Sequence, residues 1–235
     1  MVPRLELLSV KDFNMNFITI DFSLNSPGIC IFNDKRKRYH FISYIKKNGS
    51  KKAIKLQEEV GLLEDVTLVF QPDWEKELDY SSVELGKIKR YDTMSNDIIN
   101  LITQHSFPED GYQIAFEGVS YGSKSGTNNI IDMASAASIL KIKLLKHLKP
   151  EDIKTVAPAT IKKHAGKGNM NKRVLWDVFV ENRTGEDFLE ESKFWVFSKN
   201  LEVGKSVPKP FDDLVDALYL NSLLRTLQPN TFSPA

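Results

Sequence analysis

The run Phe17-Ile-Thr-Ile-Asp-Phe22 decides how this chain folds. Apolar residues occupy both alternating sets of positions, which is typical of a central strand covered by helices on each face. Turn residues follow at 24–28, and further apolar runs lie at 29–32 and 39–45. Because short connections of this kind join neighbouring strands, we predict an antiparallel meander of three strands.

Downstream of the meander, helical and strand-like patterns alternate. Strands are predicted at 113–117 and 153–156, and helices at 95–104 with Ser95 as the N-cap, at 129–148, from Thr160, at 171–181 and at about 212–227. This order predicts an α/β fold with a mixed five-stranded sheet, three antiparallel strands followed by parallel ones, and helices on both faces.

The predicted domain organisation is simple. We expect a lead-in at 1–16, one folded domain at 17–227 and a tail at 228–235. The polar stretches near 46–91 and 184–209 are interpreted as insertions, with 66–70 the only strand-like run in the first of them.

Composition excludes several classes of protein. The 235 residues are 41% hydrophobic and 27% charged, which argues against wholesale disorder, collagen-like repeats and coiled-coil rods. Cys30 is the only cysteine, so it forms no internal disulfide, as expected in a reducing compartment. No apolar run approaches the roughly 20 residues of a membrane span, and the N-terminus does not resemble a targeting peptide. We therefore expect a cytoplasmic protein.

Charge is segregated along the chain, although the formal net charge is only +1. Residues 34–55 include nine basic residues and one acid, and residues 141–173 include ten basic residues and two acids. Residues 56–118 show the opposite balance, with four basic residues and fourteen acids. Such segregation can build a cationic face for a polyanion. Solvated lysine-rich surfaces are an equally good interpretation of the pattern on its own.

Two predicted strands end in a carboxylate. Asp21 follows the first apolar run, and Glu117 ends the run Tyr112-Gln-Ile-Ala-Phe-Glu117. A buried carboxylate without a partner costs several kcal/mol, so each needs a cation, a partner or access to solvent. For Asp21 the simpler alternative is a cap on the following turn. If the two strands are adjacent and parallel, both acids come within reach of one metal ion.

A third acidic element opens the closing helix, in Phe211-Asp-Asp-Leu-Val-Asp-Ala217. Asp213 and Asp216 share one helical face, and Asp212 is the expected N-cap. Solvated first-turn acids are the alternative. Together Asp21, Glu117, Asp213 and Asp216 would form an oxygen-rich site for Mg²⁺ or Mn²⁺, and two such ions can activate water for phosphodiester hydrolysis.

A glycine-rich run, Ala165-Gly-Lys-Gly-Asn-Met-Asn-Lys172, lies within the second basic stretch. The amides of Gly166 and Gly168 could approach a phosphate, and Lys167 and Lys172 supply charge. The spacing is not that of a Walker A loop. Beside an acidic cluster, the run is interpreted as a clamp on a DNA backbone.

These four motifs, in this order, resemble the RuvC family of Holliday junction resolvases within the RNase H-like superfamily. The resemblance covers roughly 17–32 and 113–227 and includes the D-x-x-D-A ending. It implies a dimeric, metal-dependent endonuclease of DNA recombination and repair that cuts two opposed strands of a four-way junction. It further implies that Asp21, Glu117, Asp213 and Asp216 are the metal ligands, and that Lys172 contacts DNA near the cut phosphate.

The chain also departs from the family. Its long stretches at 46–91 and 184–209 suggest a phage-type or divergent member, which would act in the host cytoplasm if viral. Tyr121 is the candidate for the aromatic residue that family members place at the junction centre, although it is equally well an ordinary loop tyrosine. Lys124, in the same loop, is a further DNA-binding candidate. His164 is interpreted as a phosphate contact or as a residue without a role.

The predicted helix at 129–148 is the expected homodimer contact. Its apolar stripe contains Ile130, Met133, Ala134, Ala137 and Leu140. Burial of the helix within its own domain is the alternative. For function, two alternatives also stay open: another RNase H-like nuclease acting on branched DNA or an RNA–DNA hybrid, and a catalytically silent junction-binding protein. The intact set of four acids argues against the second, because a binder gains nothing from negative charge where DNA must lie.

Overall fold

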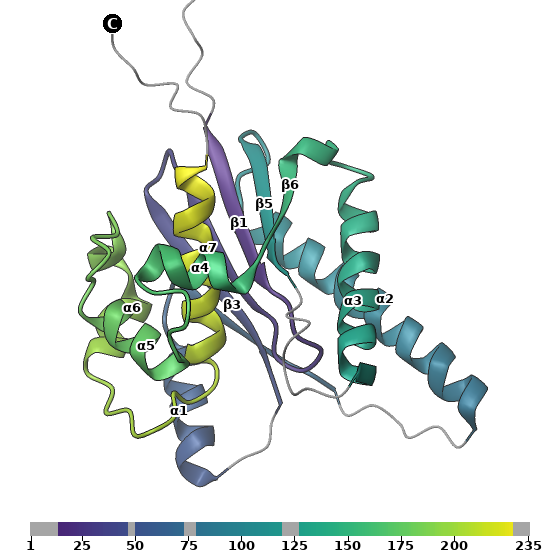
Figure 1. The fold of residues 1–235 in the computed structure, drawn as a ribbon, viewed down its shortest axis with the longest axis horizontal. Helices are drawn as coiled ribbons and strands as arrows, with labels where there is room; N and C mark the ends of the chain where they lie inside the picture. The colour runs from purple at the N-terminus through teal and green to yellow at the C-terminus, as the bar shows by residue number, and fades with distance from the viewer. Residues whose placement is uncertain (1–13, 47–49, 73–78, 119–126, 228–235) are drawn as a thin grey trace, which may run out of the picture.

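A computed structural model describes residues 14–46, 50–72, 79–118 and 127–227. Its centre is a six-stranded mixed sheet in the order β4-β3-β2-β1-β5-β6 (Figure 1). The strands are β1 Met15–Asp21, β2 Gly28–Asn33, β3 Arg38–Ile45, β4 Val66–Phe70, β5 Gly111–Glu117 and β6 Ile153–Val156. Strands β1, β2 and β3 pair antiparallel, whereas β5 pairs parallel with β1 and β6 parallel with β5.

The predicted mixed sheet is confirmed, but it has six strands and not five. Strand β4 pairs parallel with β3 at one edge, and helix α1 (Lys51–Gly61) connects them. This part of the 46–91 stretch therefore extends the sheet. The run Val66-Thr-Leu-Val-Phe70 is strand-like in the sequence, but the polar residues around it favour an insertion. Its pairing with β3 shows that it belongs to the sheet.

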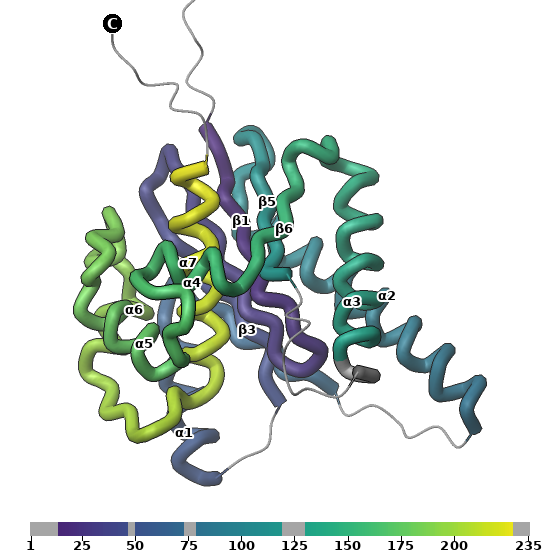
Figure 2. Tube along the Cα trace, in the orientation of Figure 1, coloured from purple at the N-terminus to yellow at the C-terminus, as the bar shows by residue number. Residues whose placement is uncertain are grey.

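Helices cover both faces of the sheet, as predicted (Figures 1 and 2). On one face lie α4 (Pro158–Ala165), α5 (Lys172–Val180), α6 (Lys193–Lys199) and α7 (Phe211–Thr226). On the other face lie α2 (Tyr80–His105) and α3 (Thr127–Leu144). Two short 3₁₀ turns, Pro150–Asp152 and Leu189–Glu191, complete the described elements. No helix in the described ranges is long and apolar enough to cross a membrane.

Two predicted caps are wrong. Ser95 is buried inside α2, whose 26 residues begin after Asp79, and the Asp79 side chain accepts a hydrogen bond from the Ser82 amide. The first half of α2 is polar, so it lacks the repeat of apolar residues from which a helix is predicted. Asp212 lies in the first turn of α7, and Pro210 occupies the N-cap position without a side-chain cap.

Helix α7 runs along β1 in a defined register. The Thr19 hydroxyl donates to the Ala217 carbonyl at 2.7 Å, and the Asn221 amide donates to the Phe17 carbonyl at 2.7 Å. Because residue numbers rise along α7 as they fall along β1, the first turns of α7 lie near the end of β1. The acids of both elements therefore meet at the end of β1, on the α7 face of the sheet.

Gly28 permits this meeting, and its replacement by alanine is expected to disturb it. A Cβ at Gly28 would lie 2.5 Å from the Asp213 carbonyl oxygen, a backbone atom that cannot rotate away. We expect Gly28→Ala to lower the free energy of unfolding by about 1–3 kcal/mol. Gly61→Ala is the control, because its Cβ would meet Leu68 at an ordinary 3.5 Å. Urea unfolding of both variants measures the difference, and equal stabilities would contradict the close approach.

A stacked histidine pair predicts a pH effect on stability. His40 and His105 lie 3.8 Å apart between ring centroids, and the Thr67 hydroxyl bonds both rings. Burial, and then His105, lowers the pKa of His40 from 6.5 to about 4. Between these values the native state binds fewer protons than the unfolded state, so stability falls as pH falls, by up to about 1.4 kcal/mol per unit of pKa shift.

The comparison with His40→Phe isolates this effect. The stability of the wild-type protein relative to the variant should decrease as pH falls from 6.5 towards 4, as measured by urea unfolding across that window. A pH-independent difference would show that His40 does not titrate as proposed. The comparison is needed because buried carboxylates elsewhere titrate with the opposite sign.

Candidate active site

The two strand-end carboxylates lie side by side. Ile20 of β1 pairs with Phe116 of β5 in a parallel register, so Asp21 and Glu117 occupy the next positions on neighbouring strands. Asp21 lies two residues after Thr19, and Glu117 lies two residues after Ala115, the partner of Thr19 on β5. Side chains two residues apart on a strand share a face, and the Thr19 side chain bonds α7, so both acids point to the α7 face. The Asp21 and Glu117 side chains share a hydrogen bond.

Helix α7 brings two further carboxylates to the same place. Asp213 and Asp216 are only 3% and 9% exposed. Asp213 lies beside Gly28, which is the cross-strand partner of Asp21. The four predicted acids are thus neighbours, although they come from three elements far apart in sequence. We call Asp21, Glu117, Asp213 and Asp216 the acidic cluster.

Burial and mutual repulsion raise the pKa of every member of the acidic cluster. Burial raises the pKa of Asp21 most, followed by the charges of Glu117, Asp216 and Asp213. Burial, then Asp216, raises the pKa of Glu117 to about 7. For Asp213 and Asp216, burial is again the first cause and Asp212 adds repulsion. Negative charge is concentrated here at a cost that a bound cation would relieve.

Two lysines contact the aspartates of α7. Lys172 Nζ lies 2.9 Å from Asp212 Oδ2, 3.2 Å from Asp216 Oδ2 and 3.7 Å from Asp213 Oδ1. Lys209 Nζ pairs with Asp213 and lies 3.2 Å from Asp212 Oδ2. Burial alone would lower the pKa of Lys172, but these carboxylates raise it further than burial lowers it. The ammonium groups therefore compensate part of the negative charge.

The chemistry of the cluster fits a hard divalent cation. Within the described ranges, no three His, Cys, Asp or Glu side chains are already spaced to hold one ion. However, Asp213 Oδ2 and Asp212 Oδ1 are buried without a hydrogen-bond partner. Buried carboxylate oxygens left unpaired are costly, and carboxylate oxygens are the ligands that Mg²⁺ and Mn²⁺ prefer. The donor set suits these ions after the lysine ammonium groups move aside.

The remaining predicted site residues fall into two groups. Gly166, Lys167 and Gly168 are exposed in the connection between α4 and α5, and Gly166 has a φ of 155° that favours glycine. Lys172, which ends this run, is the member that contacts the acids. Tyr121 and Lys124 lie outside the described residues.

Sequence reasoning missed two lysines near the acids. Lys209 precedes Asp212 and Asp213 by three and four residues, a spacing that suggests ion pairs once the helix start is known. Lys162 of α4 lowers the pKa of both Glu117 and Asp216 through its charge. No local sequence signal links Lys162 to either acid, because its distance from them depends on how α4 packs.

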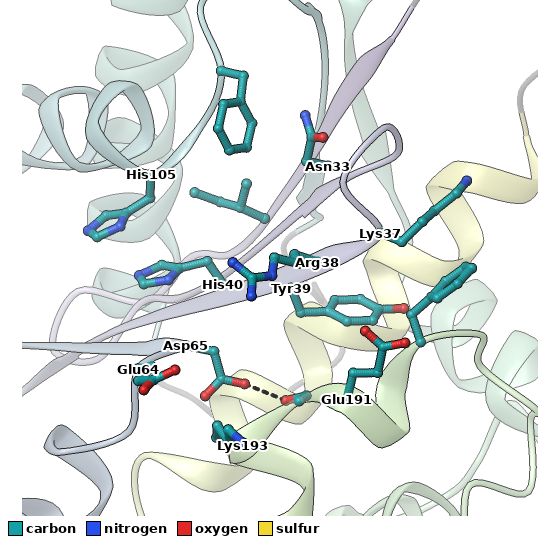
Figure 3. Close-up of a pocket in the computed structure, with 14 residues that line it drawn as sticks. Asn33, Lys37, Arg38, Tyr39, His40, Glu64, Asp65, His105, Glu191 and Lys193 are labelled. Carbon is teal, nitrogen blue, oxygen red and sulfur yellow. Dashed lines mark hydrogen bonds between the residues drawn. The ribbon is translucent and has the colours of Figure 1, made fainter.

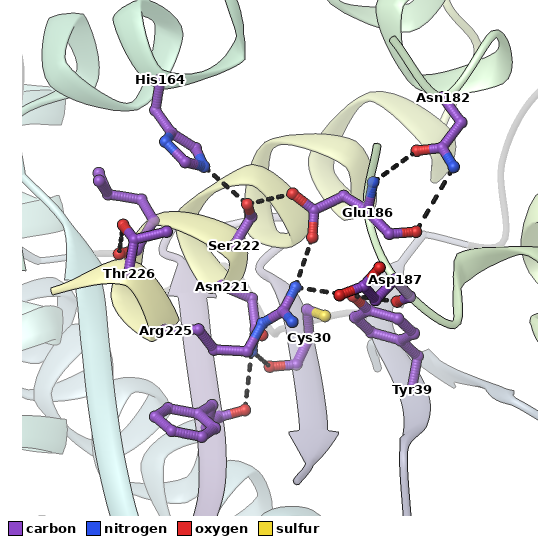
Figure 4. Close-up of polar contacts among 12 residues, drawn as sticks. Cys30, Tyr39, His164, Asn182, Glu186, Asp187, Asn221, Ser222, Arg225 and Thr226 are labelled. Atoms are coloured by element: carbon purple, nitrogen blue, oxygen red, sulfur yellow. Dashed lines mark hydrogen bonds and ion pairs between the residues drawn. The ribbon is translucent and has the colours of Figure 1, made fainter. Parts of the chain in front are cut away.

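His164 belongs to a different polar network, drawn in Figure 4. Its Nε2 lies 2.6 Å from the Ser222 hydroxyl, which donates to Glu186. Arg225 donates to Glu186 and also, at 2.9 Å, to the Tyr39 hydroxyl. These bonds tie α7 to α4 and β3. The network anchors the helix that carries Asp213 and Asp216, which is a structural role for His164.

Comparison with known proteins gives a likeness of structure only. No protein-family model and no curated protein sequence matches the chain. Among solved structures, Thermus thermophilus RuvC in complex with a Holliday junction substrate is similar at 11% identity and a TM-score of 0.48, over 91% of this chain and 94% of that one. A second Thermus thermophilus RuvC structure is similar at 11% identity and a TM-score of 0.43, over 89% of this chain and 95% of that one. A manganese-soaked human cytomegalovirus terminase nuclease domain is similar at 12% identity and a TM-score of 0.37, over 92% of this chain and 86% of that one.

Proposed function

We propose that this protein is a metal-dependent endonuclease that resolves four-way DNA junctions. One observation carries the proposal: four carboxylates from β1, β5 and α7 converge at the end of β1 and β5, and buried oxygens of Asp213 and of the adjacent Asp212 lack hydrogen-bond partners. A protein that only binds DNA would gain nothing from this concentration of negative charge. A centre that holds cations against phosphate oxygens requires it.

The acidic cluster would hold Mg²⁺ or Mn²⁺, with two ions per site as the expected number. When bound, such ions supply an activated water and stabilise the leaving oxygen of a phosphodiester. Asp21 and Glu117 contribute ligand oxygens from rigid, paired strands, and Asp213 and Asp216 contribute them from a buried helix. Rigid elements of this kind hold charged groups in place without reorganisation during the reaction.

Cations suited to a DNA backbone lie beside the acidic cluster and in the segment that leads to Lys172. Lys162, Lys163 and Lys167 lie in and just after α4, and Lys172 begins α5. Lys163 and Lys167 are exposed, so they are free to meet phosphates that pass the cluster. Lys172 contacts the acids and is half exposed, which suits a bridge between the cluster and the cut phosphate.

Paired cutting of a junction calls for two active sites, so we propose a homodimer through α3. The predicted contact stripe needs correction: Leu140 is buried and Ala137 packs against the protein's own core. The opposite side of α3 is exposed. It carries Ile131, Ser135, Ser138 and Ile142 at the alternating spacing of four and three found in helix–helix seams, and Leu145, just past the end of α3, continues that spacing. This exposed stripe is the proposed dimer surface.

A substrate panel tests the proposed activity and its alternatives. Wild-type protein is incubated with a four-way junction, a flap, an RNA–DNA hybrid and a linear duplex at one salt concentration, with Mg²⁺ and then with Ca²⁺. We expect symmetric cuts in the junction with Mg²⁺ and binding without cutting with Ca²⁺. Preferred cutting of the hybrid would favour the other nuclease, and junction binding without cutting under any metal would favour the silent binder.

Lys172→Ala tests the phosphate contact. The loss of one contact should reduce the slope of log binding constant against log salt by about 0.9, and cleavage should fall with it. Lys149→Ala is the control, because Lys149 is exposed just before β6, at the opposite end of that strand from Val156, which pairs with Glu117, and it should leave both unchanged. A Lys172 variant with an unaltered slope and cleavage rate would show that this lysine only neutralises the aspartates.

A further inference from the structure

A cavity of about 240 Å³, drawn in Figure 3, lies beside the β2–β3 hairpin. Asn33 and Arg38 pair across the end of β2 and β3 that borders the cavity, whereas Gly28 and Ser43 pair at the end nearer the acids. The cavity wall comes from the β2–β3 hairpin, the residues just before β4, the end of α2 at His105 with Phe107, and the turn and helix around Ser192. The proposed nuclease centre makes no use of this space.

The cavity carries charged groups of both signs that have no internal partner. Arg38 and Lys193 are exposed cations, and Glu64 and Glu191 are exposed acids, all lining the cavity. In the described part of the chain, none of these four side chains makes a hydrogen bond or ion pair. Figure 3 shows the Arg38 side chain in the middle of the labelled residues. Arg38 also ends the basic run Lys35-Arg-Lys-Arg38, which the acidic cluster leaves unused.

An aromatic ring is held at the cavity in a costly conformation. Phe188 has a φ of 63°, which is rare for a bulky residue and costs on the order of 1–3 kcal/mol. The surrounding structure supports it: the ring stacks on Phe32 at 6.4 Å between centroids, and Lys37 Nζ lies 5.5 Å from its centre. Even so, Phe188 remains 37% exposed. Backbone strain that presents an aromatic face to a cavity suggests a stacking partner.

These features limit the chemistry of a ligand. A simple anion would be repelled by Glu64 and Glu191, and a simple cation would be repelled by Arg38 and Lys193. The matching ligand has an anionic group, hydrogen-bond donors and a flat aromatic ring. The volume is below the roughly 300–1,000 Å³ of pockets for drug-sized molecules, so the cavity accommodates one small unit.

We propose that this cavity binds a single nucleotide unit. Its phosphate contacts Arg38 and Lys193, because guanidinium and ammonium groups pair with phosphate oxygens. Its base stacks on Phe188, and exocyclic amino groups donate to Glu64 or Glu191. The unit comes either from a free mononucleotide or from a nucleotide within a single strand. In either case the site is separate from the nuclease centre and independent of its metal.

Calorimetric titration tests this site on the full chain carrying Asp21→Asn, with EDTA present. AMP should bind saturably, and adenosine and inorganic phosphate should each bind about tenfold or more weakly, since each supplies half of the contacts. A short single-stranded adenine oligonucleotide that binds as tightly as AMP identifies a strand as the source. A much weaker oligonucleotide identifies the free nucleotide.

Matched variants assign the binding to the cavity. Arg38→Ala should weaken AMP about tenfold, and Phe188→Ala should weaken AMP and adenosine but not phosphate. Lys89→Ala should change nothing. Arg38 is exposed, so its variant stays informative even if Phe188→Ala fails to fold. The proposal is overturned if AMP and the oligonucleotide both fail to saturate, if Arg38→Ala binds AMP normally, if binding requires Mg²⁺, or if free phenylalanine binds as well as AMP.

Discussion

Junction cleavage by Asp216→Asn is expected to fall by roughly 100-fold or more relative to the wild-type protein. The substitution removes one ligand charge with almost no change of volume, and Asp216 is 9% exposed among three other acids. Asp21→Asn should have an effect of the same size, because Asp21 lies beside Glu117 on the neighbouring strand. Gel analysis of a labelled synthetic junction under single-turnover conditions with Mg²⁺ gives the rates.

Junction binding separates loss of chemistry from loss of DNA affinity. Both variants should bind the junction in Ca²⁺ as tightly as the wild-type protein or more tightly, since each removes negative charge near DNA. Asp97→Asn is the matched control, because Asp97 lies on α2 on the opposite face of the sheet. Its cleavage rate should stay unchanged. Asp21→Asn cutting at nearly the wild-type rate would refute the metal site.

Ile142→Glu is expected to convert the proposed dimer into a monomer that nicks junctions without resolving them. Ile142 is 61% exposed on the outer stripe of α3, so the substitution leaves the core intact but buries a charge in any interface formed there. Symmetric resolution needs one active site for each of two strands. A monomer should therefore give nicked junctions and few paired cuts.

Sedimentation measures the mass, and a supercoiled cruciform plasmid distinguishes nicks from paired cuts. Lys51→Glu on exposed α1 is the control for a new surface charge and should stay dimeric. A wild-type protein that is monomeric at micromolar concentration, with paired cutting intact, would contradict the dimer.

Much of the fold could be predicted from strand patterns. β1 is buried on both faces, so its apolar run identified a central strand, and the meander followed from its short turns. β4 was recognisable as a strand-like run, but its place in the sheet depends on pairing with β3, which the sequence does not show. The start of α2 escaped because it is polar. Patterns predict elements well only where those elements contribute to the core.

The candidate site could be predicted in part, for a similar reason. Asp21 and Glu117 stood out because a carboxylate ending an apolar strand is costly without a partner. Lys209 did not stand out because its ion pairs at a spacing of three and four residues depend on where α7 begins. Lys162 did not stand out because surface lysines are common and its charge reaches the acids only when α4 packs on the sheet. The predicted contact stripe on α3 includes Leu140, which is buried, and Ala137, which packs against the core, because an alternation of apolar residues does not reveal which side faces the core.

Anomalous diffraction from crystals grown with Mn²⁺ tests the central claim most directly. The account predicts manganese peaks bounded by carboxylate oxygens of Asp21, Glu117, Asp213 and Asp216, with the Lys172 and Lys209 ammonium groups moved away from the aspartates. The crystals should contain Mn²⁺ at a concentration that supports cleavage. Manganese peaks only elsewhere, with Lys172 and Lys209 still paired with the aspartates, would contradict the account.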